Sequence, residues 1–251
     1  MNNTEKFTGK ASVYSEARPS YPKALFDYLV NVEKISKDSI IADIGSGTGK
    51  FSESLLNLGF KVFAVEPNKD MRTKAENLLS LNSSFISING TDSNTTLKDN
   101  SIDYITVAQA FHWFNPIAFK KECQRILKEK GKVILVWNNR VPESEIVIKN
   151  AEICKKYCKN FKGFSGGFDI KSNSISEFFN NKYDLIKFEN NLKYDEDKFI
   201  KRILSSSYSL TDGDENYLEY INALKDFFKD YSINGILTIP NETIMYIGNV
   251  F

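Results

Sequence analysis

A glycine-rich segment and an acidic residue downstream of it form the pattern in this sequence most able to bind a nucleoside. Gly45, Gly47 and Gly49 follow a short apolar run at residues 40–44. Glycines let the backbone approach a ligand closely, and the start of a following helix offers unpaired N–H groups to a polar or anionic group. Glu66 lies about 20 positions after Gly45, where a carboxylate can accept hydrogen bonds from both hydroxyls of a ribose. This spacing predicts a nucleoside site.

Two strands and the helix between them must hold these residues in place. Residues 40–44 and 61–66 are apolar runs that end in polar residues, which predicts two neighbouring strands of a parallel sheet. Between them, apolar residues recur at helical spacing until Gly59, which predicts a helix that ends there. A strand, a glycine turn and a helix in this order form the first half of a nucleotide-binding βαβ unit.

The residue type at position 50 indicates whether the motif fits a dinucleotide or another nucleoside cofactor. A dinucleotide-binding fold would have a third glycine there, but Lys50 occupies the position. The observed pattern is Asp-x-Gly-x-Gly-x-Gly, starting at Asp43, and Glu66, Pro67 and Asn68 follow the second strand. These features argue against an NAD-type nucleotide-binding oxidoreductase, which stays the first alternative function.

The same motifs resemble those of class I S-adenosylmethionine-dependent methyltransferases. The resemblance extends to Thr91-Asp92 after the third expected strand, to residues 109–114 after the fourth, and to residues 7–22 at the start of the chain. Together these segments are similar to the small-molecule branch of the family, the methyltransferase type 11 and trans-aconitate methyltransferase-like proteins. The resemblance covers about residues 5–140 by motif and the remainder only by general layout.

The resemblance implies S-adenosylmethionine as the cofactor and S-adenosylhomocysteine as the product. The glycine turn would shape the methionine side, Glu66 would bind the ribose, and Asp92 would accept a hydrogen bond from the adenine amino group. Arg18, in a lead-in that folds over the cofactor, would face the methionine carboxylate, a pairing suited to a planar guanidinium. The full set of predicted cofactor-binding residues is Tyr14, Arg18, Asp43, Gly45, Ser46, Gly47, Glu66, Pro67, Met71, Asp92, Ser93 and Gln109.

His112 is the only histidine of the chain, and it follows the fourth expected strand. Ligands of doubly wound sheets bind at the carboxyl ends of strands, so we expect this residue to border the site. It is the predicted catalytic residue, as a general base for an acceptor whose proton must leave. Hydrogen bonding to a ligand without base chemistry and packing beside Trp113 are the alternatives that the sequence leaves open.

The methyl acceptor is predicted to be a small organic molecule that contacts aromatic side chains. Three phenylalanines alternate with three glycines in residues 161–170, a composition suited to a mobile lid over an apolar pocket. A carboxylate acceptor would require a basic residue, for which Arg140 and Arg18 are the candidates. The predicted substrate-binding residues are Trp113, Phe164, Phe168 and Tyr208.

The order of the elements predicts an α/β fold. We expect a Rossmann-like, doubly wound, seven-stranded sheet that is mostly parallel, with an antiparallel last strand and a helical cap. One methyltransferase domain would span residues 1–251. Its core would comprise about 21–140 and 182–251, with an N-terminal lid at 1–20 and a cap insertion at about 141–181 and 195–233.

Composition narrows the partners further. The net charge is +1, which disfavours a nucleic acid or an anionic membrane as partner. A methyltransferase that acts on RNA or protein stays an alternative, and the near balance of charge disfavours the RNA version. Three cysteines and no apolar leader or membrane-spanning run favour a cytoplasmic protein. The sequence has no cluster of histidines and carboxylates, so we predict no metal site. A protein that binds the cofactor without catalysis is a further alternative, and the oligomeric state is not predicted.

Overall fold

The computed structural model describes residues 19–164, 172–206 and 208–251. Of the predicted site residues, Tyr14, Arg18 and Phe168 lie outside these residues. The described residues form two compact units. Unit 1 comprises those within 1–137, 170–188 and 243–251, and unit 2 comprises those within 138–169 and 189–242. The predicted single domain with its lid and cap boundaries stays a prediction.

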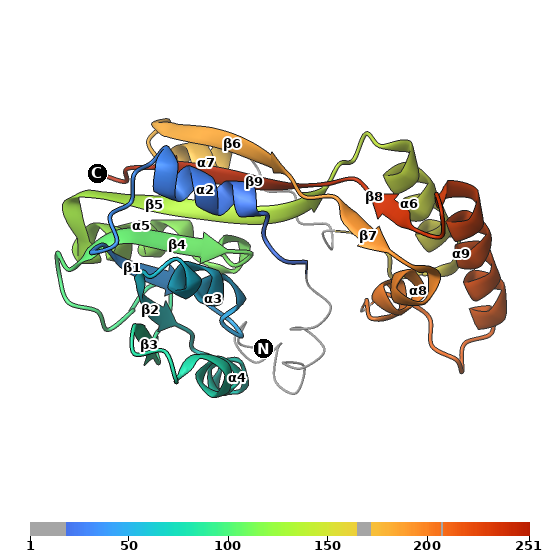
Figure 1. Ribbon diagram of the computed structural model, residues 1–251, viewed down its shortest axis with the longest axis horizontal. Coiled ribbons are helices and arrows are strands. Elements are labelled where there is room, and N and C mark those ends of the chain that lie inside the picture. The colour runs from blue at the N-terminus through green and yellow to red at the C-terminus, as the bar shows by residue number, and fades with distance from the viewer. Residues whose placement is uncertain (1–18, 165–171, 207) are drawn as a thin grey trace. The chain divides into compact units, whose positions relative to one another are not determined.

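A seven-stranded sheet forms the centre of the fold (Figure 1). Its strands are β1 (Ile40–Ile44), β2 (Lys61–Val65), β3 (Phe85–Ile88), β4 (Ile102–Ala108), β5 (Leu127–Arg140), β6 (Tyr183–Glu189) and β9 (Asn241–Gly248). They lie in the order β3-β2-β1-β4-β5-β9-β6, and β9 runs opposite to its neighbours. The predicted fold class is confirmed.

The chain reverses its direction of travel across the sheet between β1 and β4. Parallel pairing joins β1 to β2 and β2 to β3, after which the chain returns to pair β4 with the other side of β1. The connections that leave the carboxyl ends of β1 and β4 therefore run to opposite sides of the sheet. This position is a topological switch point, where open α/β sheets bind their ligands.

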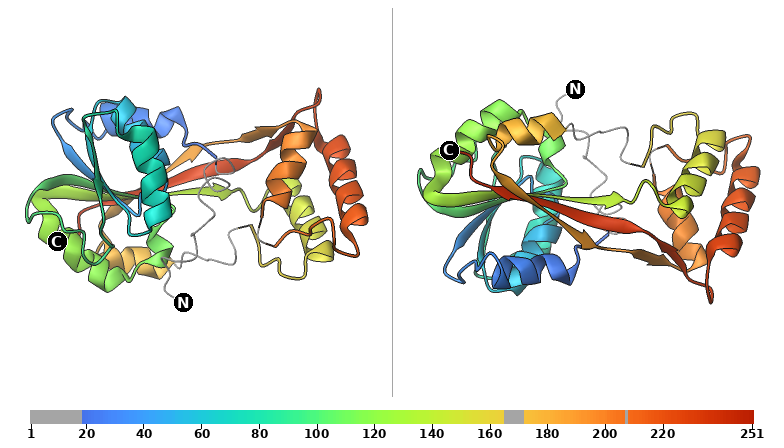
Figure 2. Two further views of the ribbon diagram at one scale, coloured as in Figure 1. Left: turned by 90° about the horizontal axis from the view of Figure 1, so that it is seen from below. Right: turned by 90° about the horizontal axis from the view of Figure 1, so that it is seen from above.

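Helices cover both faces of this sheet (Figure 2). One face buries the apolar sides of α2 (Lys23–Asn31), α3 (Lys50–Asn57) and α4 (Lys69–Leu79). The other face buries α5 (Pro116–Ile126) and the segment around α7 (Ser172–Phe178), where Phe119 stacks on Phe178 with ring centroids 5.4 Å apart. The two layers hold the strand ends rigidly, because each strand of the centre is packed on both sides.

Side-chain caps determine where two of these helices begin. The Asn68 side chain accepts a hydrogen bond from the Met71 backbone N–H, and Asn115 accepts from Ile117 and Ala118, with Pro116 as the first helical residue. Helix α5 ends before Gly131, because the backbone is already extended at Leu127. Leu127 pairs with Ile102, and the register then shifts so that Lys132 pairs with Tyr104.

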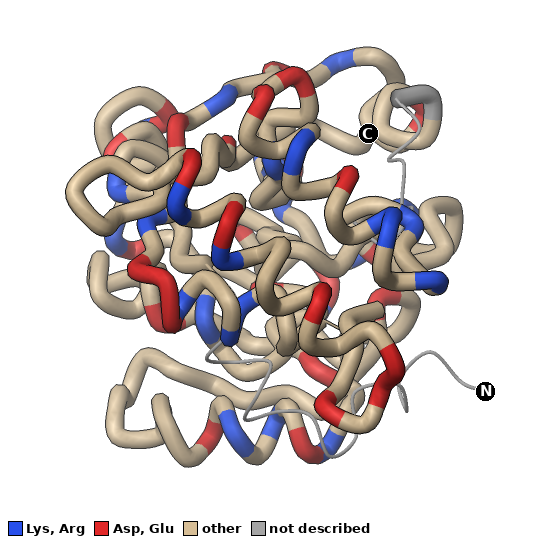
Figure 3. The backbone as a smooth tube through the Cα atoms, turned by 90° about the vertical axis from the view of Figure 1, so that its right-hand side faces the viewer, with Lys and Arg blue, Asp and Glu red and all other residues tan. Residues whose placement is uncertain are grey.

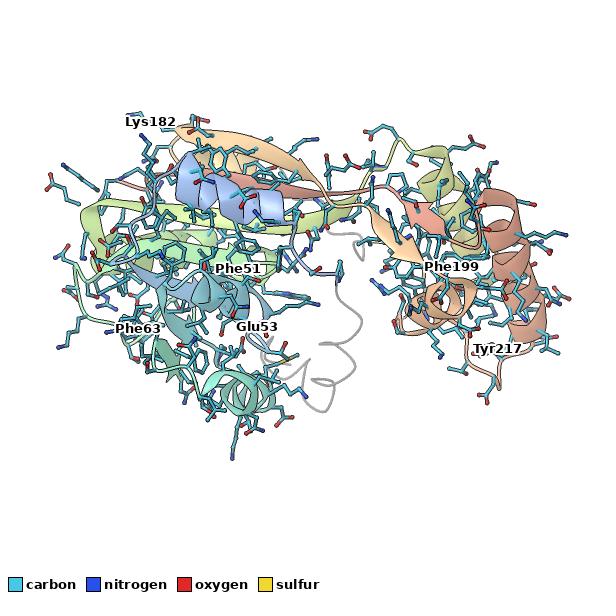
Figure 4. All side chains as sticks on the ribbon, viewed as in Figure 1. Phe51, Glu53, Phe63, Lys182, Phe199 and Tyr217 are labelled. Carbon is cyan, nitrogen blue, oxygen red and sulfur yellow. The ribbon has the colours of Figure 1, made fainter. Side chains whose placement is uncertain are left out.

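Unit 2 is built from helices α6 (Glu145–Tyr157), α8 (Glu196–Leu204) and α9 (Tyr217–Tyr231) and a two-stranded sheet. The sheet pairs β7 (Leu192–Tyr194) with β8 (Leu237–Ile239) in antiparallel orientation. Phe199, labelled in Figure 4, is fully buried among these elements, where its ring stacks on Phe227. Residues 184–194 do not form one continuous strand, because the chain leaves the extended ladder at Asn190 and Asn191. Strands β6 and β7 belong to different sheets.

Charges of both signs are mixed along the chain. Figure 3 shows Lys and Arg segments interspersed with Asp and Glu segments along the backbone, and the net charge is +1. Among the described residues, every helix is too short or too polar to cross a lipid bilayer.

Candidate functional site

The glycine turn after β1 is shaped by backbone conformations that favour glycine. Gly45, Gly47 and Gly49 have φ angles of 70°, 58° and 82°. The backbone N–H groups of Gly45 and Ser46 both donate to the Val65 carbonyl, which ties the turn to the end of β2. A Cβ atom built on Gly47 would meet no described atom within 4 Å. The backbone of Gly47 is therefore open to a ligand.

Glu66 follows β2 and points at this turn. Its Oε2 accepts a hydrogen bond from the Gly47 backbone N–H at 2.9 Å, and its Oε1 accepts from the Asn68 backbone N–H at 2.8 Å. The residue is buried, and burial raises the pKa of its carboxyl against the effect of these two bonds. The structure therefore brings the predicted acid and the predicted glycine turn into direct contact.

Arg72 holds the turn that carries Glu66. Its guanidinium donates to the carbonyl of Glu66 at 2.8 Å, to the carbonyl of Pro67 at 3.2 Å and to the side-chain oxygen of Asn89 at 3.2 Å. All three bonds come from Nη1, so one end of the guanidinium joins the turn after β2 to the end of β3. The sequence analysis did not predict this residue, although arginine is rare here, with five among 33 basic residues.

Asp43 lies beneath the turn, in the interior of the sheet. Its carboxylate accepts hydrogen bonds from the hydroxyls of Ser52 at 2.6 Å and Thr106 at 2.9 Å, and so joins β1 to α3 and β4. Burial raises its pKa to about 6, the two hydroxyls oppose the shift, and the charge of Glu66 adds to it. Only 1% of the surface of Asp43 is exposed, so its role is to hold β1, α3 and β4 together beneath the glycine turn.

Asp92 connects the loop after β3 to the segment after β4. Its Oδ2 accepts a hydrogen bond from the Asn115 backbone N–H at 3.3 Å. Partial burial raises its pKa, against the hydrogen bonds that it accepts from backbone N–H groups. Ser93, next along the loop, is exposed, and its hydroxyl lies 3.4 Å from that of Thr91. The structure places both residues at the carboxyl edge of the sheet, where they were predicted.

The segment after β4 packs against the glycine turn. Gln109 has a φ of 58°, a left-handed conformation that is uncommon outside glycine and asparagine, and its N–H donates to the Val136 carbonyl. A Cβ atom on Gly45 would come within 2.7 Å of the Ala110 Cβ and 3.1 Å of the Phe114 ring. The glycine turn and the segment after β4, predicted from two distant motifs, are therefore in direct contact. Met71, at the start of α4, is buried.

His112 lies in a short 3₁₀ helix, η2 (Phe111–Trp113). The indole N–H of Trp137 donates to its Nδ1 at 3.5 Å, and the ring of Trp113 lies 4.9 Å from its own, centroid to centroid. In the neutral form the proton of the imidazole is then on Nε2. In this tautomer the side chain can donate a hydrogen bond through Nε2. Phe111 is buried in the core, whereas His112 and Trp113 are partly exposed.

The remaining predicted substrate residues lie in unit 2. Phe164 and Tyr208 both contact Phe161, with ring centroids 5.2 and 4.8 Å away. The guanidinium of Arg140 lies 3.6 Å from the centroid of the Phe164 ring. The predicted substrate set is therefore divided between Trp113 in unit 1 and this aromatic group in unit 2.

Comparisons with known proteins agree with this geometry. Residues 42–135 match the methyltransferase domain family. The chain is 34% identical over 134 residues to an uncharacterized methyltransferase of Mycobacterium bovis, a match that covers 53% of this chain and 52% of that protein. The chain thus spans about half the length of the curated relatives it matches.

Solved structures share the fold at low sequence identity. A protein assigned as a type II methyltransferase from Anaeromyxobacter dehalogenans matches with a TM-score of 0.62 at 19% identity, over 93% of this chain and 98% of that one. Phosphoethanolamine N-methyltransferase 2 of Haemonchus contortus, solved with phosphomonomethylethanolamine and S-adenosylhomocysteine, matches with a TM-score of 0.57 at 13% identity, over 98% of this chain and 59% of that one. Residues 42–135 therefore match a methyltransferase domain, and the sheet that contains them has the same fold as these solved methyltransferase structures.

Proposed function

We propose that this chain is an S-adenosylmethionine-dependent methyltransferase that acts on a small organic molecule. The observation that carries the proposal is the contact between the Glu66 carboxylate and the Gly47 backbone at the switch point of the sheet. An acid in this position can accept the hydroxyls of a ribose. The methyltransferase domain match and a fold neighbour that binds S-adenosylhomocysteine support the choice of cofactor.

The described residues fit an adenosine-containing cofactor. Gly47 is open on the side where a Cβ would stand, so a ligand can approach its backbone. Glu66 would hold the ribose, Asp92 the adenine amino group, and the turn at 45–47 the methionine part. When bound, the cofactor supplies a sulfonium methyl group that is already electrophilic. The protein then has to orient the acceptor and exclude water.

His112 would orient the acceptor by donating a hydrogen bond. Because Trp137 donates to its Nδ1, the neutral ring carries its proton on Nε2 and offers a donor. This role differs from the general base that the sequence analysis predicted. His112→Gln retains a side-chain donor and would keep turnover within a few-fold, whereas loss of a base would reduce it by about 10²- to 10⁴-fold.

A small molecule is preferred to a nucleic acid on charge. The chain has a net charge of +1, and its basic and acidic residues are interspersed along the backbone drawn in Figure 3. Nucleic-acid binding depends on neutralising several phosphates, which requires a basic surface. We therefore propose a small-molecule acceptor.

The test is calorimetry with S-adenosylhomocysteine and, separately, with NAD. We expect saturable binding of S-adenosylhomocysteine, weakened at least about 100-fold by Glu66→Ala, since charged hydrogen bonds are each worth about 1.5–3 kcal/mol. The control is Glu53→Ala on α3, an exposed glutamate labelled in Figure 4, which should bind normally. Binding of NAD alone would overturn the proposal in favour of an oxidoreductase. Binding of S-adenosylhomocysteine without turnover on a substrate panel would favour a non-catalytic protein.

A further inference from the structure

Four buried side-chain nitrogens of the described residues have no hydrogen-bond partner, and all four belong to unit 2. They are Nη1 of Arg140, Nδ2 of Asn150, Nε of Arg202 and Nδ2 of Asn241. Each is a donor. A buried N–H group without an acceptor is unfavourable by about 1–3 kcal/mol, and more when it is charged. Such groups therefore indicate a missing acceptor.

Arg140 is held in a fixed orientation by aromatic rings. Its guanidinium lies over the Phe164 ring, 3.6 Å from the centroid, and Phe164 packs on Phe161, which packs on Tyr208. The ring face contacts the flat side of the guanidinium and leaves its N–H edge for hydrogen bonds. Burial lowers the pKa of Arg140 to about 10, so it is still positively charged at neutral pH.

A second arginine lies near the first. The positive charge of Arg202 lowers the pKa of Arg140 further, and the two arginines together oppose the rise in the pKa of Tyr208 that burial causes. The groups that act most on Arg140 by charge are Tyr208, Arg202, Tyr194 and Cys154, and none of these is an acid that ionises at neutral pH. Among the described residues, the groups with the strongest electrostatic effect on Arg140 thus supply no anionic counter-charge at neutral pH.

Asn150 extends this cluster. Its Oδ1 accepts a hydrogen bond from the thiol of Cys154 at 3.7 Å, which leaves its unpartnered Nδ2 as a donor. Cys154 is also close enough to Arg140 and Tyr208 for both to lower its pKa, which burial raises to about 11. Asn150 is fully buried, so its Nδ2 needs an acceptor inside the protein or from a bound molecule.

An oxyanion would satisfy this arrangement. Two neighbouring positive charges repel each other in a desolvated site, and a ligand carboxylate or phosphate supplies both the counter-charge and several acceptor lone pairs. Arginine is the residue that binds such groups through two parallel N–H bonds. Its use is selective here, because arginine makes up five of the 33 basic residues and two of the five lie in this cluster.

We infer that unit 2 contains a binding site for the oxyanion of a small organic molecule, formed by Arg140 and Arg202 with Asn150 as a neutral donor. The inference concerns unit 2 alone and holds whether or not the proposed function is correct. Carboxylate and phosphate share the required chemistry, and the experiment distinguishes them.

The experiment is calorimetry on the full chain with four probes: succinate, its neutral analogue succinamide, glycerol 3-phosphate and inorganic phosphate. We expect saturable binding of succinate or of glycerol 3-phosphate and none of succinamide. Binding of succinate alone assigns a carboxylate, and tighter binding of glycerol 3-phosphate than of inorganic phosphate assigns an organic phosphate. Binding of neither succinate nor either phosphate would overturn the inference.

Three variants locate the site. Arg202→Gln should weaken binding at least 10-fold, whereas Lys201→Gln, the exposed neighbour on α8, should leave it unchanged. Equal weakening by both would show a diffuse charge effect and would contradict the site. Arg140→Met keeps the packing on Phe164 but removes the charged donors, so we expect lost anion binding with an unchanged or raised Tm. Retained anion binding in Arg140→Met would exclude Arg140. Binding of S-adenosylhomocysteine, measured on the same samples, tests the proposed function separately.

Discussion

The two units differ in how completely their buried polar groups are hydrogen-bonded within the protein. In unit 1, Asp43, Glu66 and Glu122 are buried, and each carboxylate accepts at least two hydrogen bonds from the protein. In unit 2, the guanidinium groups of Arg140 and Arg202 each retain a buried N–H without a partner among the described residues. Paired groups stabilise the fold that carries them, whereas unpaired donors lower its stability and are explained by a ligand. The contrast distinguishes buried polar residues that stabilise the fold from buried polar residues that we propose bind a ligand.

The largest effect should come from removing an arginine that is paired. Arg125 donates to the carboxylate of Glu122 at 2.7 and 2.9 Å and to the Leu97 carbonyl at 2.8 Å. Arg125→Met would leave the Glu122 carboxylate buried beside Thr95 without its counter-charge. We expect the free energy of unfolding to fall by about 3 to 4 kcal/mol in urea titrations. A loss below about 1 kcal/mol would mean that pairing in unit 1 is not what stabilises it.

The second effect is a pH dependence that originates at Asp43. Its folded-state pKa of about 6 lies above its ordinary value of 3.8. The native state therefore binds this proton more tightly than the unfolded chain, and the resulting stabilisation is full below about pH 4 and is lost as the pH rises through about 6. Between pH 4 and 7, wild-type stability should fall by about 2 to 3 kcal/mol relative to Asp43→Asn.

Urea unfolding at pH 4, 5.5 and 7 measures this dependence. Asp226→Asn, an exposed carboxylate on α9, is the matched control and should follow the wild type at every pH. Parallel profiles for wild type and Asp43→Asn would contradict the raised pKa.

A smaller loss is expected at Arg72, which acts on Glu66 through the backbone. Arg72→Met would remove three hydrogen bonds at the ends of β2 and β3 while keeping most of the side-chain volume. We expect a loss of about 1 to 2 kcal/mol in unfolding free energy, at about 0.5 to 1.5 kcal/mol per bond with partial compensation by water. Affinity for S-adenosylhomocysteine should fall about tenfold. Lys74→Met on the same helix is the control, and an equal loss of affinity there would deny Arg72 a positioning role.

The smallest effect should be the substitution of the same type in unit 2. Arg140→Met is expected to change the unfolding free energy by no more than about 1 kcal/mol, or to raise it, because no protein hydrogen bond of Nη1 is lost. The comparison with Arg125→Met uses the same pair of residue types in both units. A loss at Arg140 as large as that at Arg125 would remove the distinction between the units.

The sequence predicted the parts of the molecule that depend on local pattern. The glycine turn after β1 and the acid that follows β2 each depend on neighbours within a few residues, and the structure has both. Arg72 could not be assigned, because its partners are backbone carbonyls, which any sequence provides. The cluster of Arg140 and Arg202 joins residues 62 positions apart, and no periodicity marks such a pair. Arg140 was named from the sequence as a candidate for a carboxylate acceptor, but nothing in the sequence connects Arg202 to it.

The two backbone hydrogen bonds that hold the Glu66 carboxylate affect how it would bind a ligand. Each of its oxygens already accepts one backbone N–H, and each has a second lone pair left over. An incoming pair of hydroxyls would find the acid already immobilised and would need to displace neither bond. Immobilising a side chain on binding costs about 0.5 to 1.5 kcal/mol. For Glu66 this entropy is lost when the chain folds, so it does not reduce the affinity for the ligand.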